Sequence, residues 1–144
     1  MHAAVLWSHI LEWEYREFEG DDVFDYAGWF DGSSSTTKDK ANLSLQWMWN
    51  DWSVAYLGEY ISGQVAEAFF IPEYIQKIPS RMYHDLVASF TFGGLGGSTR
   101  LSAGITNLTD EAPPYIDTGF NASTDPSTYR LFGRGYYLRL KWAF

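Results

Sequence analysis

Apolar and polar side chains alternate along much of this chain, and the alternation is clearest at its end. Large apolar residues occupy every second position there: Tyr136, Leu138, Leu140, Trp142 and Phe144. Arg139 and Lys141 lie between them. Because successive side chains of an extended backbone point to opposite faces, this period predicts a strand with one apolar face and one charged face.

The same period predicts six strands in all, separated alternately by long and short connections. The expected strands cover residues 4–18, 41–50, 52–61, 85–92, 100–106 and 136–144. Leu57 and Ile61 fall on the expected polar side of the third strand. Brief turns lie near residues 50 and 95, and long loops cover residues 19–40, 64–82 and 109–132. Short turns at one end and long loops at the other are typical of outer-membrane barrels. The predicted fold class is therefore all-β, a transmembrane antiparallel β-barrel fragment of about six up-and-down strands.

Composition supports a strand-based membrane structure and excludes other classes. The chain has 7 Trp, 10 Tyr and 10 Phe, more rings than one soluble core ordinarily needs, and membrane barrels concentrate such rings in two girdles. The net charge of −8 argues against a nucleic-acid partner. No cysteine is present to form disulfides. No run reaches the 18 or more apolar residues of a membrane helix.

The charged faces limit how the six strands can be arranged. A one-residue slip of the last strand would turn Arg139 and Lys141 toward lipid, at up to roughly 2–4 kcal/mol each. A closed six-stranded barrel would have a radius of only roughly 6 Å and would desolvate residues such as Glu12, Glu59 and Arg139 together. A 22-stranded barrel, with a radius of roughly 22 Å, leaves room for a hydrated wall. We expect the chain to be part of the larger kind.

Several motifs between residues 78 and 144 occur in a distinctive order. They are Pro79-Ser80 before the strand that opens with Asp85-Leu86, then Asn107-Leu108-x-Asp110, then Pro113-Pro114, then Gly133-Arg134 before the final strand, and last Phe144. This order resembles the C-terminal end of TonB-dependent outer-membrane receptors. Thr109 is a departure, since the family usually has an aromatic residue there.

The resemblance implies that residues 1–144 are the C-terminal part of a receptor β-barrel domain of 22 strands in the outer membrane. The plug domain and the signal peptide are expected to lie outside this sequence, because Met1 is followed by no basic start or cleavage site. The implied function is uptake of a scarce ligand: a ferric siderophore, cobalamin or an oligosaccharide. Implied partners are the lipid bilayer, the rest of the barrel and plug, the TonB complex acting through the plug, and the transported ligand.

The terminal strand carries a second implication of the resemblance. The barrel assembly machinery is thought to recognise such a strand by its last aromatic residue and its alternating apolar positions. An extended strand can pair by its edge with the machinery's own sheet. The expected assembly signal is Tyr136, Leu138, Leu140, Trp142 and Phe144.

Loop aromatics are the candidate ligand-contacting residues. Phe24, Tyr26, Trp29 and Phe30 in the first loop can either stack on a sugar or an aromatic siderophore or pack against one another. Tyr115 in the last loop is a further candidate.

Nothing in the pattern of titratable residues indicates catalysis. Glu12 and Glu14 share a face that a hydrated wall explains, and His2, His9 and His84 lack metal-ligand spacing. The sequence therefore predicts no enzyme, no metal site and no cofactor.

A second class of function stays open. A soluble β-sandwich that binds carbohydrate through its aromatics would also alternate in this way. The two classes differ in what covers the apolar side. A sandwich buries Leu138, Leu140 and Trp142 against a second sheet, whereas a barrel segment leaves them as one exposed band.

Overall fold

The computed structural model describes residues 1–16, 18–20, 22–32, 34–67, 75–94, 96–119 and 122–143, and these contain strands but no helix. The strands are β1 (His2–His9), β2 (Glu14–Tyr15), β3 (Phe24–Asp25), β4 (Trp29–Phe30), β5 (Ser35–Thr36), β6 (Asp39–Trp49), β7 (Trp52–Ile61), β8 (Gln64–Glu67), β9 (Ile75–Ile78), β10 (Arg81–Gly94), β11 (Gly97–Thr106) and β12 (Gly135–Ala143). Within the described part of the chain, no helix is long and apolar enough to cross a membrane.

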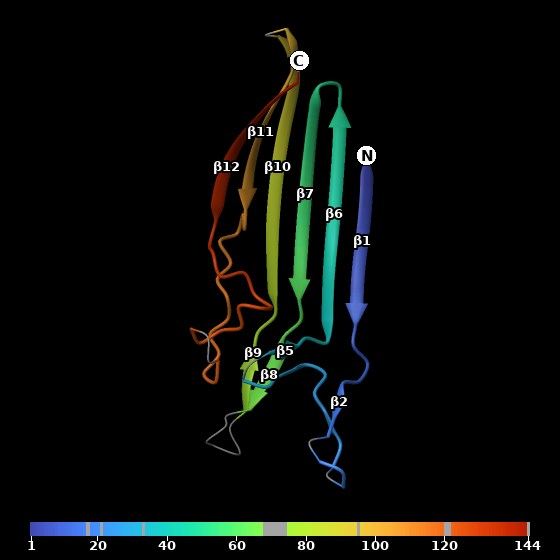
Figure 1. Ribbon diagram of the computed structural model, residues 1–144, viewed down its shortest axis with the longest axis vertical. Helices are drawn as coiled ribbons and strands as arrows, with labels where there is room; N and C mark the ends of the chain where they lie inside the picture. The colour runs from blue at the N-terminus through green and yellow to red at the C-terminus, as the bar shows by residue number, and fades with distance from the viewer. Residues whose placement is uncertain are drawn as a thin grey trace.

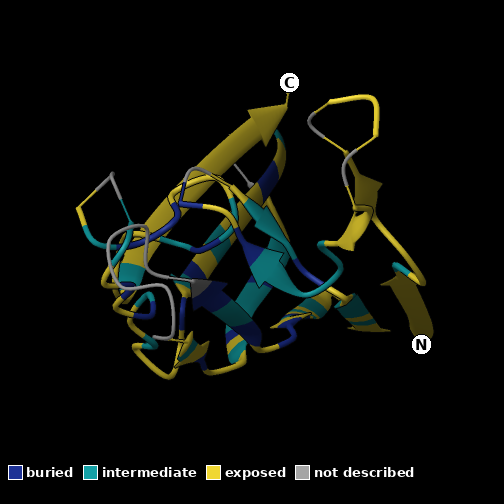
Figure 2. Cartoon of the chain, turned by 90° about the horizontal axis from the view of Figure 1, so that it is seen from below, coloured by how far each residue is buried: buried dark blue, intermediate teal, exposed yellow. Residues whose placement is uncertain are grey.

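Six long strands form one antiparallel sheet in the order β1-β6-β7-β10-β11-β12 (Figure 1). Each of them pairs with the next long strand along the chain, so the connectivity is an up-and-down meander. The all-β class and the six-stranded antiparallel arrangement predicted from the sequence are confirmed. Among the described strands, β1 and β12 form the two edges of this sheet, and both are exposed along almost their whole length (Figure 2).

The register of the sheet sorts the side chains into two chemically different faces. Trp7 pairs with Ala41, Val54 with Ala88, and Leu101 with Leu140, so apolar residues meet across every ladder. We call this side the apolar face and the other side the polar face. Eight Asp, Glu, Lys or Arg residues lie in the six strands, and seven of them are on the polar face: Lys40, Glu59, Arg81, Asp85, Arg100, Arg139 and Lys141.

The exceptions on the apolar face have polar partners. Asp39, at the start of β6, accepts hydrogen bonds from Trp7 Nε1 at 3.1 Å and lies 2.7 Å from His9 Nδ1. His84 Nδ1 lies 2.6 Å from the Tyr56 hydroxyl. A Cβ on Gly58 would lie 2.9 Å from that hydroxyl, so the glycine leaves room for the Tyr56–His84 pair.

Connections of different length are segregated between the two ends of the sheet. The β6–β7 and β10–β11 turns lie at one end, and the long connections gather at the other (Figure 1). Asn50, in the β6–β7 turn, has a φ of 50°, a left-handed conformation that Asn tolerates better than most residues. At the opposite end, β5-β4-β8-β9 form a small four-stranded sheet and β2-β3 a two-stranded ribbon.

The buried core lies at the end of the sheet that carries the long connections. It contains Phe30, Ile61, Ala66, Ile78, Tyr83, Ile116 and Tyr129. Ile61 and Tyr83 reach this cluster from the polar face of β7 and β10. The apolar Ile61 on a polar face is therefore explained, because it packs against the loops rather than facing water.

The main difference from the sequence prediction concerns the first strand. It was expected to continue to Phe18, but β1 ends at His9. The backbone N–H of Ile10 makes one more bond, to the carbonyl of Lys38 at 2.9 Å. Beyond it the partner chain turns away, because β5 pairs with β4 instead. β10 is longer than expected and starts at Arg81, and the expected last residue of the final strand, Phe144, lies outside the described residues.

Gly104 is the position of the main sheet where a side chain should be least tolerated. It pairs with Tyr137, whose ring occupies the space that a Cβ on Gly104 would fill. Gly104→Ala must displace that ring and is expected to lower the free energy of unfolding by about 1 kcal/mol. Gly93→Ala is the matched control, since nothing lies within 4 Å of its added Cβ. Urea unfolding followed by circular dichroism compares them, and equal stability of the two variants would contradict this packing.

Candidate functional site

The first long connection is folded into two short ribbons that place most of the candidate aromatics. In one ribbon Tyr15 of β2 pairs with Phe24 of β3. In the other, β4 lies between β5 and β8, so that Trp29 pairs with Thr36 on one side and Val65 on the other. These pairings fix the backbone of the first connection although it contains only two-residue strands.

Asp25 fixes the backbone where the first ribbon ends and the chain turns toward the second. Its Oδ1 accepts hydrogen bonds from the backbone N–H groups of Trp13 and Ala27, both at 2.9 Å. The N–H of Tyr26 also donates to the carbonyl of Trp13 at 2.8 Å. The two bonds from Trp13 and Ala27 stabilise the ionised carboxylate, so they hold the pKa of Asp25 below its usual range.

Three of the predicted residues meet in one aromatic cluster. The ring of Phe24 contacts Tyr26 at 4.7 Å and Trp29 at 5.2 Å between centroids, both edge to face. Tyr15 lies edge-on to Tyr26 at 6.4 Å. These are favourable ring geometries worth about 0.5–1.5 kcal/mol each. Packing against the neighbouring rings therefore explains the position of the Phe24 side chain.

The other rings of the cluster line an open cavity of about 530 Å³, which we call the aromatic pocket. Its lining residues are Trp13, Tyr15, Tyr26, Trp29, Asp31, Ser34 and Thr36. Trp13 and Tyr15 are each 58% exposed. Asp31 accepts hydrogen bonds from the backbone N–H of Ser34 at 2.7 Å and from its hydroxyl at 3.4 Å, which places the carboxylate at the pocket wall.

The remaining two candidates lie elsewhere. Phe30 is only 2% exposed and belongs to the buried core, so it supports the loops instead of meeting a ligand. Tyr115 is exposed in the last long connection, where its carbonyl accepts a hydrogen bond from Gln76 Nε2 at 3.0 Å. Neither residue lines the aromatic pocket.

Sequence reasoning missed Trp13 and Tyr15 as site residues. Both were assigned to the apolar side of a first strand that was thought to reach Phe18. The adjacent apolar residues Ile10 and Leu11 break the period of two, and this break was the signal that the strand had ended.

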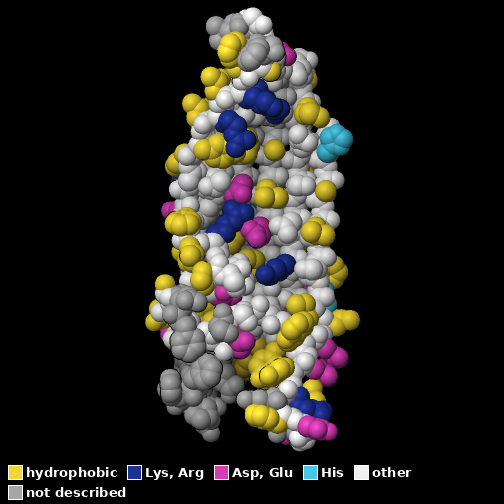
Figure 3. Space-filling model, in the orientation of Figure 1, with side chains coloured by type: hydrophobic (Ala, Val, Ile, Leu, Met, Phe, Trp, Pro, Cys, Tyr) yellow, Lys and Arg dark blue, Asp and Glu magenta, His cyan; other side chains and the backbone are white. Residues whose placement is uncertain are grey.

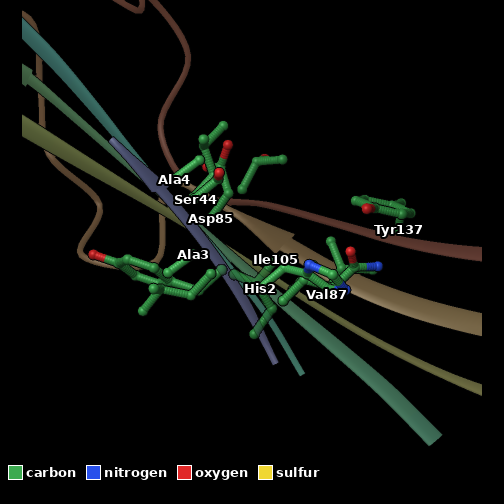
Figure 4. A pocket seen from close by; sticks show the side chains of 14 residues that line it. His2, Ala3, Ala4, Ser44, Asp85, Val87, Ile105 and Tyr137 are labelled. Carbon is green, nitrogen blue, oxygen red and sulfur yellow. The ribbon is translucent and has the colours of Figure 1, made fainter. Parts of the chain in front are cut away.

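The polar face forms a second concavity, an open trough of about 650 Å³ (Figure 4). Residues from both edge strands line it, including His2 of β1 and Tyr137 of β12, so the sheet curves around it. Figure 3 shows basic and acidic side chains along the middle of this face and hydrophobic side chains along its margins. Its lining is mixed: Ala4, Ala55, Leu57 and Val87 are apolar, and Ser44, Asp85 and Thr106 add polar groups.

An ion-pair network anchors the last long connection to the polar face. Arg130 lies 2.9 Å from Glu59 Oε2 of β7 and 2.7 Å from Asp85 Oδ1 of β10. Its guanidinium also lies 5.1 Å from the ring centre of the buried Tyr83. Burial opposes the charge of Arg130, but the hydrogen bonds that its guanidinium donates to the two carboxylates outweigh this effect and raise the pKa of Arg130.

Several residues on which the family resemblance depends come together at the same connection. Asn107, at a φ of 51°, donates its backbone N–H to Asp85 at 2.9 Å and bonds Glu111 in both directions through its amide. Asp110 accepts the backbone N–H of Arg134 at 2.7 Å, and a Cβ on Gly133 would lie 2.7 Å from the same carboxylate oxygen. These motif residues thus have a structural role in closing the loop onto β12.

The residues of the expected assembly signal share one face of β12. Tyr136, Leu138, Leu140 and Trp142 are exposed on the apolar face at the edge of the sheet. Phe144, the fifth residue of that signal, lies outside the described residues.

Comparison of the chain with protein-family models, curated proteins and solved structures gave no match. Its function is therefore argued from the two faces of the sheet and from the loop site.

Acid should loosen the backbone that Asp25 fixes. Because the pKa of Asp25 is lowered on folding, its contribution is present above the pKa of the unfolded chain, about 4, and is lost as the pH falls through the lower folded value. Near-UV circular dichroism of the aromatic cluster is expected to decay over that range in the natural chain. Asp25→Asn should weaken the signal already at neutral pH. Asp22→Asn, on an exposed neighbour, is the control, and identical acid profiles for all three proteins would refute the role of Asp25.

Removing the guanidinium of Arg130 should release the last connection. Arg130→Gln leaves Glu59 and Asp85 facing each other without a cation and is expected to cost about 1–3 kcal/mol of unfolding free energy. Hydrogen exchange at Asn107 and Leu108 should rise. Arg139→Gln removes an exposed arginine of the polar face and should change neither quantity by a comparable amount. Unchanged exchange in Arg130→Gln would show that the network does not hold the loop.

Proposed function

We propose that this chain forms part of the wall of an outer-membrane β-barrel, as the C-terminal barrel segment of a TonB-dependent receptor that imports a scarce ligand. The observation that carries the proposal is the apolar face. Its exposed large side chains are Val5, Trp7, Trp47, Trp49, Trp52, Tyr60, Met82, Phe92, Leu101, Tyr136, Leu138, Leu140 and Trp142. The described residues place no second sheet over them.

Energetics require a cover for this face. Fully burying one large apolar side chain is worth about 1.5–3 kcal/mol, and because these thirteen are 38–73% exposed, covering what remains is worth on the order of 10–20 kcal/mol. A folded domain is stable by only about 5–15 kcal/mol. A surface of this size is therefore expected to lie against hydrocarbon or against a large apolar partner.

The distribution of residue types on the face favours hydrocarbon. Trp52 and Tyr60 lie at the two ends of β7, with Val54, Tyr56 and Gly58 between them on the same face. Their eight-residue separation corresponds to roughly 26 Å along the strand and roughly 20 Å along the membrane normal at a tilt of about 40°. Aromatic ends around an aliphatic band roughly 25 Å tall are typical of outer-membrane barrels.

The polar face and the loops support the same function. Seven charged strand residues on one face suit a water-filled interior and would be costly in lipid. The long connections, with the aromatic pocket among them, gather at one end of the sheet (Figure 1). We assign that end to the outside of the cell, where a receptor meets its ligand.

The other function considered, a soluble carbohydrate-binding sandwich, fits these observations less well. It needs a second layer on the apolar face, and the strand and loop residues of the structure supply none there. The small four-stranded sheet lies at the loop end and contributes Phe30, Ala66 and Ile78 to the core on the polar side. A barrel wall requires no additional layer.

Tryptophan fluorescence can test the proposal, because the seven tryptophans divide between two places. Five lie on the apolar face and two, Trp13 and Trp29, line the aromatic pocket. In vesicles of lipids brominated on their acyl chains, we expect strong quenching of the natural chain. The quenched fraction should rise in Trp13→Phe/Trp29→Phe and fall in Trp47→Phe/Trp49→Phe. A chain that stays in the aqueous phase, unquenched and monomeric without detergent, would exclude a membrane wall.

A further inference from the structure

We propose that the aromatic pocket binds a neutral saccharide unit, which selects an oligosaccharide among the ligand classes of the receptor. The inference rests on the proposed function only for the direction in which the pocket faces, toward the outside of the cell. Binding itself depends on the residues that line the pocket.

The shape of the pocket suits a small ligand made of rings. Its volume of about 530 Å³ lies within the range of small-molecule sites, roughly 300–1,000 Å³. Trp13 and Tyr15 lie beside or in β2, whereas Tyr26 and Trp29 lie after β3. Tyr15 and Tyr26 contact each other edge to face at 6.4 Å, so the four rings form one aromatic surface on which a ligand ring can pack.

The chemistry of the lining matches both parts of a sugar. A pyranose has a face of C–H groups, which packs on aromatic rings, and a rim of hydroxyls, which need hydrogen-bond partners. Asp31, Ser34 and Thr36 provide a carboxylate and two hydroxyls at the pocket wall. Because each carboxylate oxygen accepts more than one hydrogen bond, Asp31 can serve a sugar hydroxyl while it holds Ser34.

The charge of the surrounding connection excludes an anionic ligand. Residues 10–38 contain eight acidic and two basic side chains, a net charge of −6 out of −8 for the whole chain. Among the described residues that line the aromatic pocket, none is basic. A negatively charged ferric chelate or a phosphate ester would therefore be repelled within a screening length of about 8 Å.

The carboxylates nearest the pocket also hold the loops in place. The carboxylate of Asp31 is already engaged with the backbone N–H and the hydroxyl of Ser34. Asp25 is likewise directed to the N–H groups of Trp13 and Ala27 and does not line the pocket.

The test measures binding to the full chain in detergent micelles by intrinsic fluorescence and calorimetry. The probes are neutral maltohexaose, cellohexaose and xylohexaose, an anionic ferric tris-catecholate, and tetramethylammonium. We expect at least one neutral hexasaccharide to bind and to change the fluorescence of Trp13 and Trp29. Tyr26→Ala and Trp29→Ala should each weaken that binding three- to tenfold, and Asp31→Asn should weaken it severalfold.

Two control variants isolate the pocket. Tyr115→Ala removes an exposed loop aromatic outside it, and Trp47→Ala removes a ring of the apolar face; neither should change saccharide affinity. Near-UV circular dichroism checks that the pocket variants keep their loops. If none of the hexasaccharides binds, or if the ferric chelate or the ammonium ion binds as tightly, the inference is overturned.

Failure of this inference can be told apart from failure of the proposed function. Quenching by brominated lipid without saccharide binding would leave the membrane wall standing and remove the sugar site. Saccharide binding by a chain that stays soluble and unquenched would support the site and overturn the receptor, leaving the carbohydrate-binding module.

Discussion

Cross-strand pairing in a fixed register is the constraint on which the rest of this structure depends. Six strands joined edge to edge satisfy one another's backbone groups and at the same time commit each side chain to one of two faces. Seven of the eight charged strand residues fall on one of them. A slip of one residue would exchange the faces and, in a membrane, cost roughly 2–4 kcal/mol for each basic residue near the midplane. That penalty exceeds the whole stability of an ordinary domain once several charges are moved.

The end of the sheet that carries the long connections follows a different rule. There, loops cover apolar residues of the polar face such as Ile61 and Tyr83, so these residues pack in the buried core and do not face water. Arg130 joins the two parts, since it pairs with carboxylates of β7 and β10 while its own segment lies in the last connection. A small core and a small ionic network thus fix the loops to the six-stranded sheet, and both lie on its polar face.

Aromatic residues have two separate uses in this chain. On the apolar face of the main sheet most of them lie toward the ends of the strands, and Tyr56 lies between these ends and pairs with His84. In the first connection, Asp25 and the short ribbons hold the rings around an acidic pocket. The first connection differs from the six-stranded sheet in being both acidic and rich in aromatic residues.

The period of two by itself determined most of the sheet. It placed the second, third, fifth and sixth strands within a few residues of their observed bounds, because a half-exposed strand must alternate wherever its two sides meet different environments. It also determined which residues share a face. A local pattern is sufficient there, since each side chain's direction follows from its own backbone.

Only the tertiary structure decided where β1 ends and which aromatics form a site. β1 stops at His9 because its partner chain, some thirty residues away, leaves the sheet; the break of the period at Ile10 and Leu11 marks this end in the sequence but does not show where the chain goes next. The same departure moves Trp13 and Tyr15 from the expected apolar face into the aromatic pocket, while Phe30 is drawn into the buried core. These outcomes depend on contacts between distant segments, and the sequence specifies such contacts only through the folded chain.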